Sequence, residues 1–153
     1  MQEGQPVEQG QEIGQVGMSG VATGSHLHFE VRFGENLYQR TSNPELWLRP
    51  HQAESGEMNG GMAVRTLDAA GNPVEIESAV VQRLDGPGGV NLGERYPQVY
   101  EEKNLAGQAP FEESFAAGDL APGWYRVSFA YRGVQQREFQ VLPGQLTVLT
   151  FEF

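Results

Sequence analysis

The residues best suited to chemistry are two histidines that stand two positions apart, His26 and His28. They lie within residues 23–32, where polar and apolar residues alternate as they do in a β-strand. Successive side chains of a strand point to opposite faces, so both imidazoles and Glu30 would share one face. The apolar residues of the opposite face, which we expect to be buried, are Leu27, Phe29 and Val31. At a rise of about 3.3 Å per residue, the two histidine backbones would lie about 6.6 Å apart. Because imidazole is a common zinc ligand, this pair predicts metal chemistry.

The pair is a weak motif by itself. Three histidines scattered over 153 positions give this spacing in about one sequence in twenty-five. A catalytic zinc takes three protein ligands and keeps one position for water. Glu30 would lie about 13 Å from His26 along the same strand, too far to close one metal shell with His28. His51, the third histidine, is followed four residues later by Ser55, and we expect it to be solvated. The chain therefore offers an incomplete set of ligands.

The charge and composition exclude several classes of partner. The chain has 20 Asp and Glu against 10 Lys and Arg, for a formal net charge of -10, and shows no basic cluster. Such a surface repels phosphate backbones and anionic membranes, so neither nucleic acid nor a membrane surface is an expected partner. There is no cysteine, which excludes thiolate zinc sites and disulfides. We also expect no membrane span, because 18 apolar residues never run together.

The expected fold class is all-β. The 20 glycines and 9 prolines are typical of short strands joined by turns, and no stretch keeps a helical period. The clearest strand is residues 124–132, where apolar side chains alternate with polar ones. The apolar residues of this stretch are Tyr125, Val127, Phe129 and Tyr131. Six or seven such strands over residues 62–153 indicate a small β-sandwich.

Residues 3–48 resemble the C-terminal half of the lysostaphin-like zinc metallopeptidases, which cut peptidoglycan cross-links. The resemblance rests on the glycine-rich stretch 7–20, on Thr23-Gly24 before the histidines, on Phe29-Glu30-Val31-Arg32 after them, and on the closing Asn43-Pro44. It implies a partial antiparallel β metallopeptidase domain. It also implies that His28 is a zinc ligand and that His26 is the catalytic group beside the metal, either a general base or a stabiliser of the transition state.

The same resemblance implies which zinc ligands this sequence lacks. The family's other two zinc ligands form a His-x-x-x-Asp motif far upstream, and none of the three histidines here stands in such a motif. We therefore expect these 153 residues to be a fragment that is inactive alone, whose parent holds zinc and hydrolyses a peptidoglycan stem or cross-bridge peptide. An extracytoplasmic location, in the periplasm, cell envelope or medium, follows from the resemblance only.

The second half of the chain resembles the carboxypeptidase regulatory-like, prealbumin-like β-sandwich. Two turn motifs carry this resemblance, Asp-x-x-Gly-x-Pro-Val at residues 68–74 and Leu-x-Pro-Gly followed by Trp-Tyr at residues 120–125. Domains of this kind are noncatalytic spacers or adhesion modules. The expected organisation is a partial peptidase domain over 1–48, a small and polar linker over 49–61 and the sandwich over 62–153.

Two further interpretations stay open at this stage. In one, a degenerate peptidase half and the sandwich form a noncatalytic envelope module that serves as a scaffold, a wall-binding surface or an activator of another enzyme. In the other, His26 and His28 are hydrogen-bonded histidines without any ligand. An upstream His-x-x-x-Asp motif in the full reading frame would favour the enzyme over the noncatalytic module. Zinc titration would separate both of these from the interpretation in which the histidines have no ligand.

Overall fold

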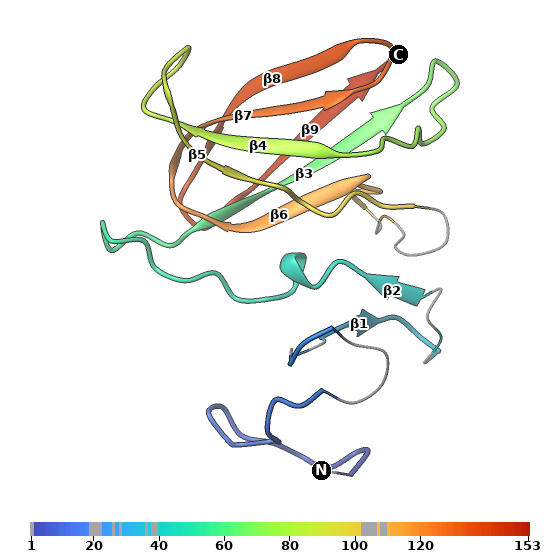
Figure 1. The fold of residues 1–153 in the computed structure, drawn as a ribbon, viewed down its shortest axis with the longest axis vertical. Coiled ribbons are helices and arrows are strands. Elements are labelled where there is room, and N and C mark those ends of the chain that lie inside the picture. The colour runs from blue at the N-terminus through green and yellow to red at the C-terminus, as the bar shows by residue number, and fades with distance from the viewer. Residues whose placement is uncertain are drawn as a thin grey trace.

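The structure is a computed structural model of the whole chain (Figure 1). The residues that it describes are 2–18, 23–25, 27, 29–35, 37, 40–101, 107 and 110–153. Both candidate site residues, His26 and His28, lie outside them. The described part is all-β apart from one 3-10 turn, which confirms the expected fold class. Within that part, no helix has the length and apolar character needed to cross a membrane.

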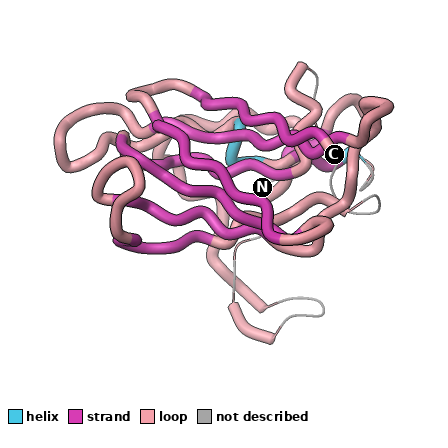
Figure 2. The backbone as a smooth tube through the Cα atoms, turned by 90° about the horizontal axis from the view of Figure 1, so that it is seen from above, coloured by secondary structure: helices cyan, strands magenta, loops and turns pink. Residues whose placement is uncertain are grey.

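The body of the molecule is made of two sheets. Their strands are β3 (Gly60–Leu67), β4 (Ala79–Leu84), β5 (Asn91–Arg95), β6 (Phe115–Leu120), β7 (Gly123–Ala130), β8 (Val134–Val141) and β9 (Leu146–Glu152). One sheet has the order β6-β3-β9 and the other β5-β4-β7-β8. All neighbours are antiparallel except β3 and β9, which pair in parallel. Strands cross the body and loops gather at its ends (Figure 2).

The two sheets face each other across an aromatic core. On β7, Val127 and Phe129 are at most 5% exposed, so the alternation expected for this strand is confirmed. The ring of Phe129 lies edge-on to Phe115 of the other sheet, with centroids 6.1 Å apart, and to Phe151 of β9, at 4.8 Å. Edge-to-face pairs suit the quadrupoles of the rings and add to the free energy gained by burying them. This core fixes how the two sheets pack.

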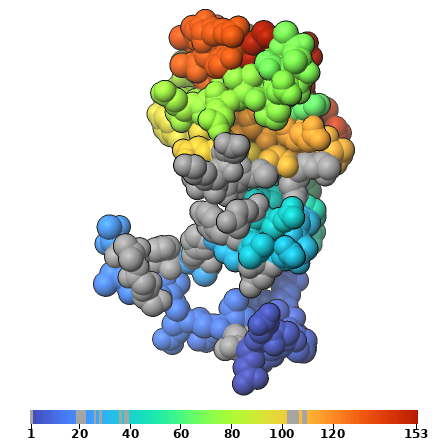
Figure 3. Space-filling model, turned by 90° about the vertical axis from the view of Figure 1, so that its right-hand side faces the viewer, coloured from blue at the N-terminus to red at the C-terminus, as the bar shows by residue number. Residues whose placement is uncertain are grey.

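The N-terminal segment is organised differently. Its regular elements among the described residues are β1 (Val31–Arg32), β2 (Thr41–Ser42) and the 3-10 turn η2 (Pro44–Leu46). Residues 2–18 are all exposed, including Ile13 at 59% and Val16 at 64%. In the space-filling view this blue part of the chain extends away from the sandwich (Figure 3). A two-stranded sheet is marginal in water, so this segment gains little stability from its own contacts.

Residues 49–61 connect the two parts along one end of the sandwich. Strand β3 begins at Gly60, inside the stretch expected to be a linker, and Gly61 N donates to Gln145 O at 2.9 Å. Just before it, Asn59 N donates to His51 O at 2.8 Å and closes a short loop. The connection is therefore tied to the sandwich by hydrogen bonds along part of its length.

Candidate functional site

The strand expected over residues 23–32 is short in the structure. Among its described residues only Val31 and Arg32 have strand geometry, paired with Ser42 and Thr41 of β2. The apolar face expected to be buried is largely open, since Leu27 is 77% and Phe29 is 53% exposed. That expectation was wrong for these two residues, because alternation shows which side chains share a face and not whether a second layer covers them.

Glu30, the third residue of the expected chemical face, is engaged by its neighbours. Its Oε2 accepts a hydrogen bond from Arg32 Nε at 2.6 Å, and the hydroxyl of Thr41 on β2 lies 3.4 Å away. The same carboxylate forms an ion pair with the Arg32 guanidinium. Glu30 therefore links β1 to β2 and has a role in holding this hairpin.

The two histidines predicted to serve the metal site, His26 and His28, lie outside the described residues. Within the described ranges, no three His, Cys, Asp or Glu side chains are grouped so that they could hold a metal ion. The predicted roles of His28 as a zinc ligand and of His26 as a catalytic group stay predictions.

The Asn-Pro segment forms the turn that its sequence predicts. Asn43 Oδ1 accepts a hydrogen bond from Glu45 N at 3.0 Å and caps η2, with Pro44 at the first position of the turn. Pro suits this position because its fixed φ fits the turn and its missing N–H would have no partner there. Beyond the turn, Trp47 stays 54% exposed and packs against Phe33, with ring centroids 5.0 Å apart. The turn thus ends the N-terminal segment at the face of the sandwich.

Polar contacts fix η2 against β6. Glu45 Oε2 accepts a hydrogen bond from Gly118 N at 2.6 Å. Gly118 has room for no side chain, because a Cβ there would lie 2.7 Å from the carbonyl oxygen of Glu45. The Tyr100 hydroxyl donates to Glu113 Oε1 at 3.1 Å and also bonds the side chain of Asn43. Burial and the Glu113 carboxylate raise the pKa of Tyr100, so the phenol stays neutral. The N-terminal segment and the sandwich therefore share a specific interface.

A second contact of this interface joins His51 to Asp119. His51 Nδ1 lies 2.7 Å from Asp119 Oδ2, and His51 N and Asn59 Nδ2 each donate to Asp119 Oδ1 at 2.8 Å. The hydrogen bonds from Asn59 and His51 lower the pKa of Asp119 to about 2. The His51 side chain is 84% exposed, in keeping with the expected solvated histidine, but it is held by this carboxylate. The pairing joins residues 68 apart in sequence, and no local pattern predicts it.

Several hollows open beside Asp119, and two of them adjoin at Arg95. The larger, of about 280 Å³, lies where β4, β5, β6 and β7 meet and is lined by Arg83, Arg95, Leu120 and Tyr125 among others. The smaller, of about 180 Å³, lies against η2. Arg95 and Asp119 line both. Sequence reasoning missed these hollows because strands far apart in the chain form them.

The comparison with known proteins concerns the N-terminal segment. The family model "Peptidase family M23" matches residues 1–43, which include both candidate histidines. The match spans 43 of the 153 residues and agrees with the resemblance drawn from the motifs of this segment. No curated protein matches the chain. The N-terminal segment is thus similar to M23 peptidases.

Proposed function

We propose that residues 1–48 are the C-terminal part of an M23-type zinc endopeptidase domain that hydrolyses peptidoglycan stem or cross-bridge peptides. The observation that carries this proposal is the family match over residues 1–43, in which the His-x-His pair stands on the stretch expected to be a strand. The proposed roles are a zinc ligand for His28 and a catalytic group for His26. The proposed location is the cell envelope or the medium, where that substrate lies.

The residues present fit zinc in kind but not in number. Imidazole nitrogen is a preferred zinc ligand, and a catalytic site needs three protein ligands. The described residues supply no cluster of ligands, and the sequence has no His-x-x-x-Asp. We therefore propose that the other ligands come from outside these 153 residues, and that the chain alone neither holds zinc tightly nor cleaves peptides.

The chemistry can be assigned by residue. Bound zinc would polarise the peptide carbonyl and lower the pKa of a water molecule. His28 would hold the metal through one ring nitrogen, and its other ring nitrogen would be fixed by a hydrogen bond. His26, two residues away on the same face, would move a proton to the leaving amine or donate a hydrogen bond to the oxyanion.

The apolar side chains exposed on the N-terminal segment suggest that a further layer of protein packs against it. Val7, Ile13, Val16 and Met18 are each more than half exposed, as are Leu27 and Phe29. We interpret this group of exposed apolar side chains within residues 7–29 as an interaction surface. We propose that this surface packs against the rest of the peptidase domain, which would supply the missing ligands.

The proposed role of residues 62–153 is to hold the end of the peptidase domain without taking part in catalysis. The contacts of Glu45 with Gly118 and of Asn43 with Tyr100 support this role, because they fix the turn that closes the peptidase segment. Residues 49–61 then act as a connection that is bonded to the sandwich through His51.

Activity of the full reading frame tests the proposal. The protein encoded by that frame is purified with zinc and incubated with peptidoglycan, and the released peptides are separated by mass. We expect new amine ends from the wild type, and a loss of at least a hundredfold in rate for His28→Ala and for His26→Ala, the range of a general acid or base. A His51→Gln variant controls for the loss of an imidazole. Absence of hydrolysis by the zinc-loaded wild type would contradict the proposal and favour the noncatalytic envelope module.

A further inference from the structure

The hollow where β4, β5, β6 and β7 meet has the character of a small binding site. Its volume of about 280 Å³ is below the range of pockets for drug-sized ligands, so it suits a group of one or two small residues. Its apolar lining is Val81, Leu120 and the ring of Tyr125, which are all at most 5% exposed. Its wall toward solvent is formed by Arg83 of β4 and Arg95 of β5.

The two guanidinium groups of the hollow have unused donors. Arg95 Nη1 donates to Gly118 O at 2.9 Å, which orients the group, and no other bond of its side chain to a described residue is present. Neither Arg83 nor Arg95 lies within ion-pair distance of a carboxylate among the described residues. Both lie close enough to Tyr125 for their charges to oppose the rise in its pKa that burial causes. Both guanidinium groups therefore keep donors that a ligand in the hollow could use.

The carboxylates that line the hollow are already satisfied. Glu94 accepts hydrogen bonds from Gln82 at 2.8 Å and Tyr96 at 2.6 Å, and Asp119 accepts those of His51 and Asn59. These carboxylates keep their negative charge and have most of their acceptor sites occupied, so an anion is favoured only where it lies nearer to the guanidinium groups than to Glu94 and Asp119. The groups that remain available to a ligand are therefore the N–H donors of Arg83 and Arg95.

A neighbouring loop restricts where an anion could sit. Glu54 and Glu57, both exposed, line a separate hollow on the other side of Arg83. Their charges would repel an anion that approached from that side. The favourable position is between Arg83 and Arg95, from which the smaller hollow continues past Asp119 to η2.

We propose that this hollow binds the free terminal carboxylate of a short peptide, with Arg83 and Arg95 on the carboxylate and a small side chain on the apolar floor of Val81, Leu120 and Tyr125. Guanidinium groups suit carboxylates because their planar donors match the two oxygens. β5 is the edge strand of its sheet, so an extended chain can approach the hollow along it. The proposal rests on the proposed function: it makes the sandwich the part that holds one end of the peptide substrate.

A titration of the 153-residue chain, without zinc, tests the site. The probe is N-acetyl-alanyl-alanine with a free carboxylate, and its C-terminal amide is the control ligand. Binding is followed by calorimetry and by backbone amide shifts of residues around Arg95. We expect the acid to bind at least about tenfold more tightly than the amide, the ratio that one charge-assisted hydrogen bond provides. Its affinity should fall as salt is added.

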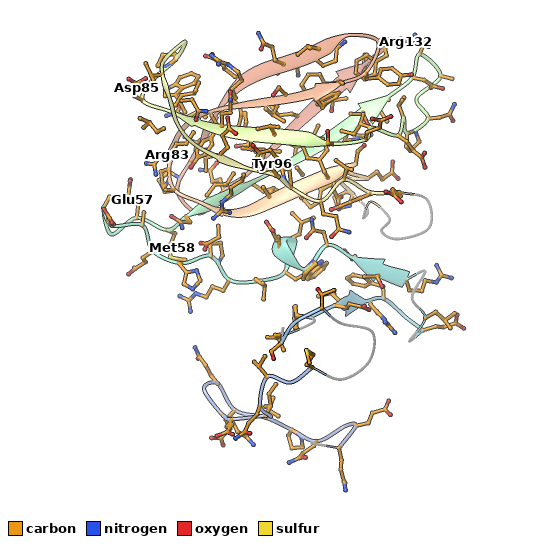
Figure 4. All side chains as sticks on the ribbon, in the orientation of Figure 1. Glu57, Met58, Arg83, Asp85, Tyr96 and Arg132 are labelled. Carbon is orange, nitrogen blue, oxygen red and sulfur yellow. The ribbon has the colours of Figure 1, made fainter. Side chains whose placement is uncertain are left out.

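Two arginine variants make the test specific. Arg83 and Arg132 lie at opposite ends of the sandwich, both are exposed, and their change to glutamine alters the charge equally (Figure 4). We expect Arg83→Gln to weaken binding of the acid about tenfold and Arg132→Gln to change it less than twofold. Equal binding of acid and amide, equal effects of the two variants, or no binding of the acid would each overturn the proposal. Because the titration needs neither zinc nor hydrolysis, its failure is distinct from failure of the peptidase proposal.

Discussion

Replacing Asp119 by alanine should destabilise the sandwich and loosen the connection to the N-terminal segment. The Asp119 carboxylate accepts hydrogen bonds from His51 N and Asn59 Nδ2, each at 2.8 Å, and lies 2.7 Å from His51 Nδ1. Asn59 is only 8% exposed, and without the carboxylate its amide keeps only the longer contact to the Asp119 carbonyl oxygen, at 3.5 Å. Asp119 also has φ +53°, a conformation that aspartate and asparagine accept more readily than alanine.

The magnitude can be built from these parts. The fall of the Asp119 pKa from 3.8 to about 2 corresponds to about 2.4 kcal/mol, and screening reduces this to about 1 kcal/mol, since 38% of the side chain is exposed. The positive φ adds about 1 kcal/mol for alanine. We expect a loss of about 2 kcal/mol for Asp119→Ala, and about 1 kcal/mol for Asp119→Asn, which keeps the backbone preference and one acceptor.

Urea unfolding followed by circular dichroism measures these differences, with an unchanged m-value as evidence that only stability has changed. The pH dependence gives an independent check. Because folding lowers the pKa of Asp119, its contribution is complete above about pH 3.8 and is lost as the pH falls through about 2. The wild type should therefore lose more stability between pH 4 and 2 than Asp119→Asn. A loss below about 0.5 kcal/mol for Asp119→Ala, or equal losses for both variants, would refute the reasoning.

Three further predictions concern the interface and the core. Gly118→Val should separate η2 from β6, because its side chain would meet the Glu45 backbone, and the amide of residue 118 would lose the Glu45 carboxylate as its acceptor. Amide exchange at residue 118, relative to its intrinsic rate, should then rise while exchange in β7 stays slow, and unchanged exchange there would contradict the interface. Phe129→Ala should cost about 3 to 5 kcal/mol in urea unfolding, because the residue is 5% exposed and packs on two rings of the facing sheet; a cost below about 1 kcal/mol would mean that the core lies elsewhere. Trp47→Ser should change the free energy of unfolding by less than about 0.5 kcal/mol, since the ring is 54% exposed, and a larger loss would show that it packs more closely than its exposure indicates.

The parts of the fold that the sequence predicts are those with a local cause. The alternation in residues 124–132 predicts β7 because burial of one face selects every second residue, and the Asn43-Pro44 pair predicts the start of η2 because capping acts over two or three residues. The contact of His51 with Asp119 and the parallel pairing of β3 with β9 have no such local signal. They depend on how strands that are far apart in the sequence come together. The periodicity of the sequence carries no information about this pairing.

The candidate site also combines features that have a local signal in the sequence with features that depend on tertiary structure. The spacing of His26 and His28 predicts metal chemistry, and this stays a prediction because both residues lie outside the described ones. The exposure of Leu27 and Phe29 does not follow from the pattern, since it depends on a partner layer that alternation does not specify. The arginine-lined hollow arises from β4 and β5 coming together, with Arg83 opposite Gly93 in their register.

The zinc content of the protein encoded by the full reading frame tests most directly whether the histidine pair serves a metal. The wild type, His28→Ala and His51→Gln proteins are dialysed against trace zinc, and bound metal is measured by mass spectrometry. We predict one zinc per wild-type chain, one in His51→Gln and a loss of most of the metal in His28→Ala, while the 153 residues alone retain none after dialysis. A wild-type protein without zinc, or a His28→Ala protein that keeps it, would contradict the assignment.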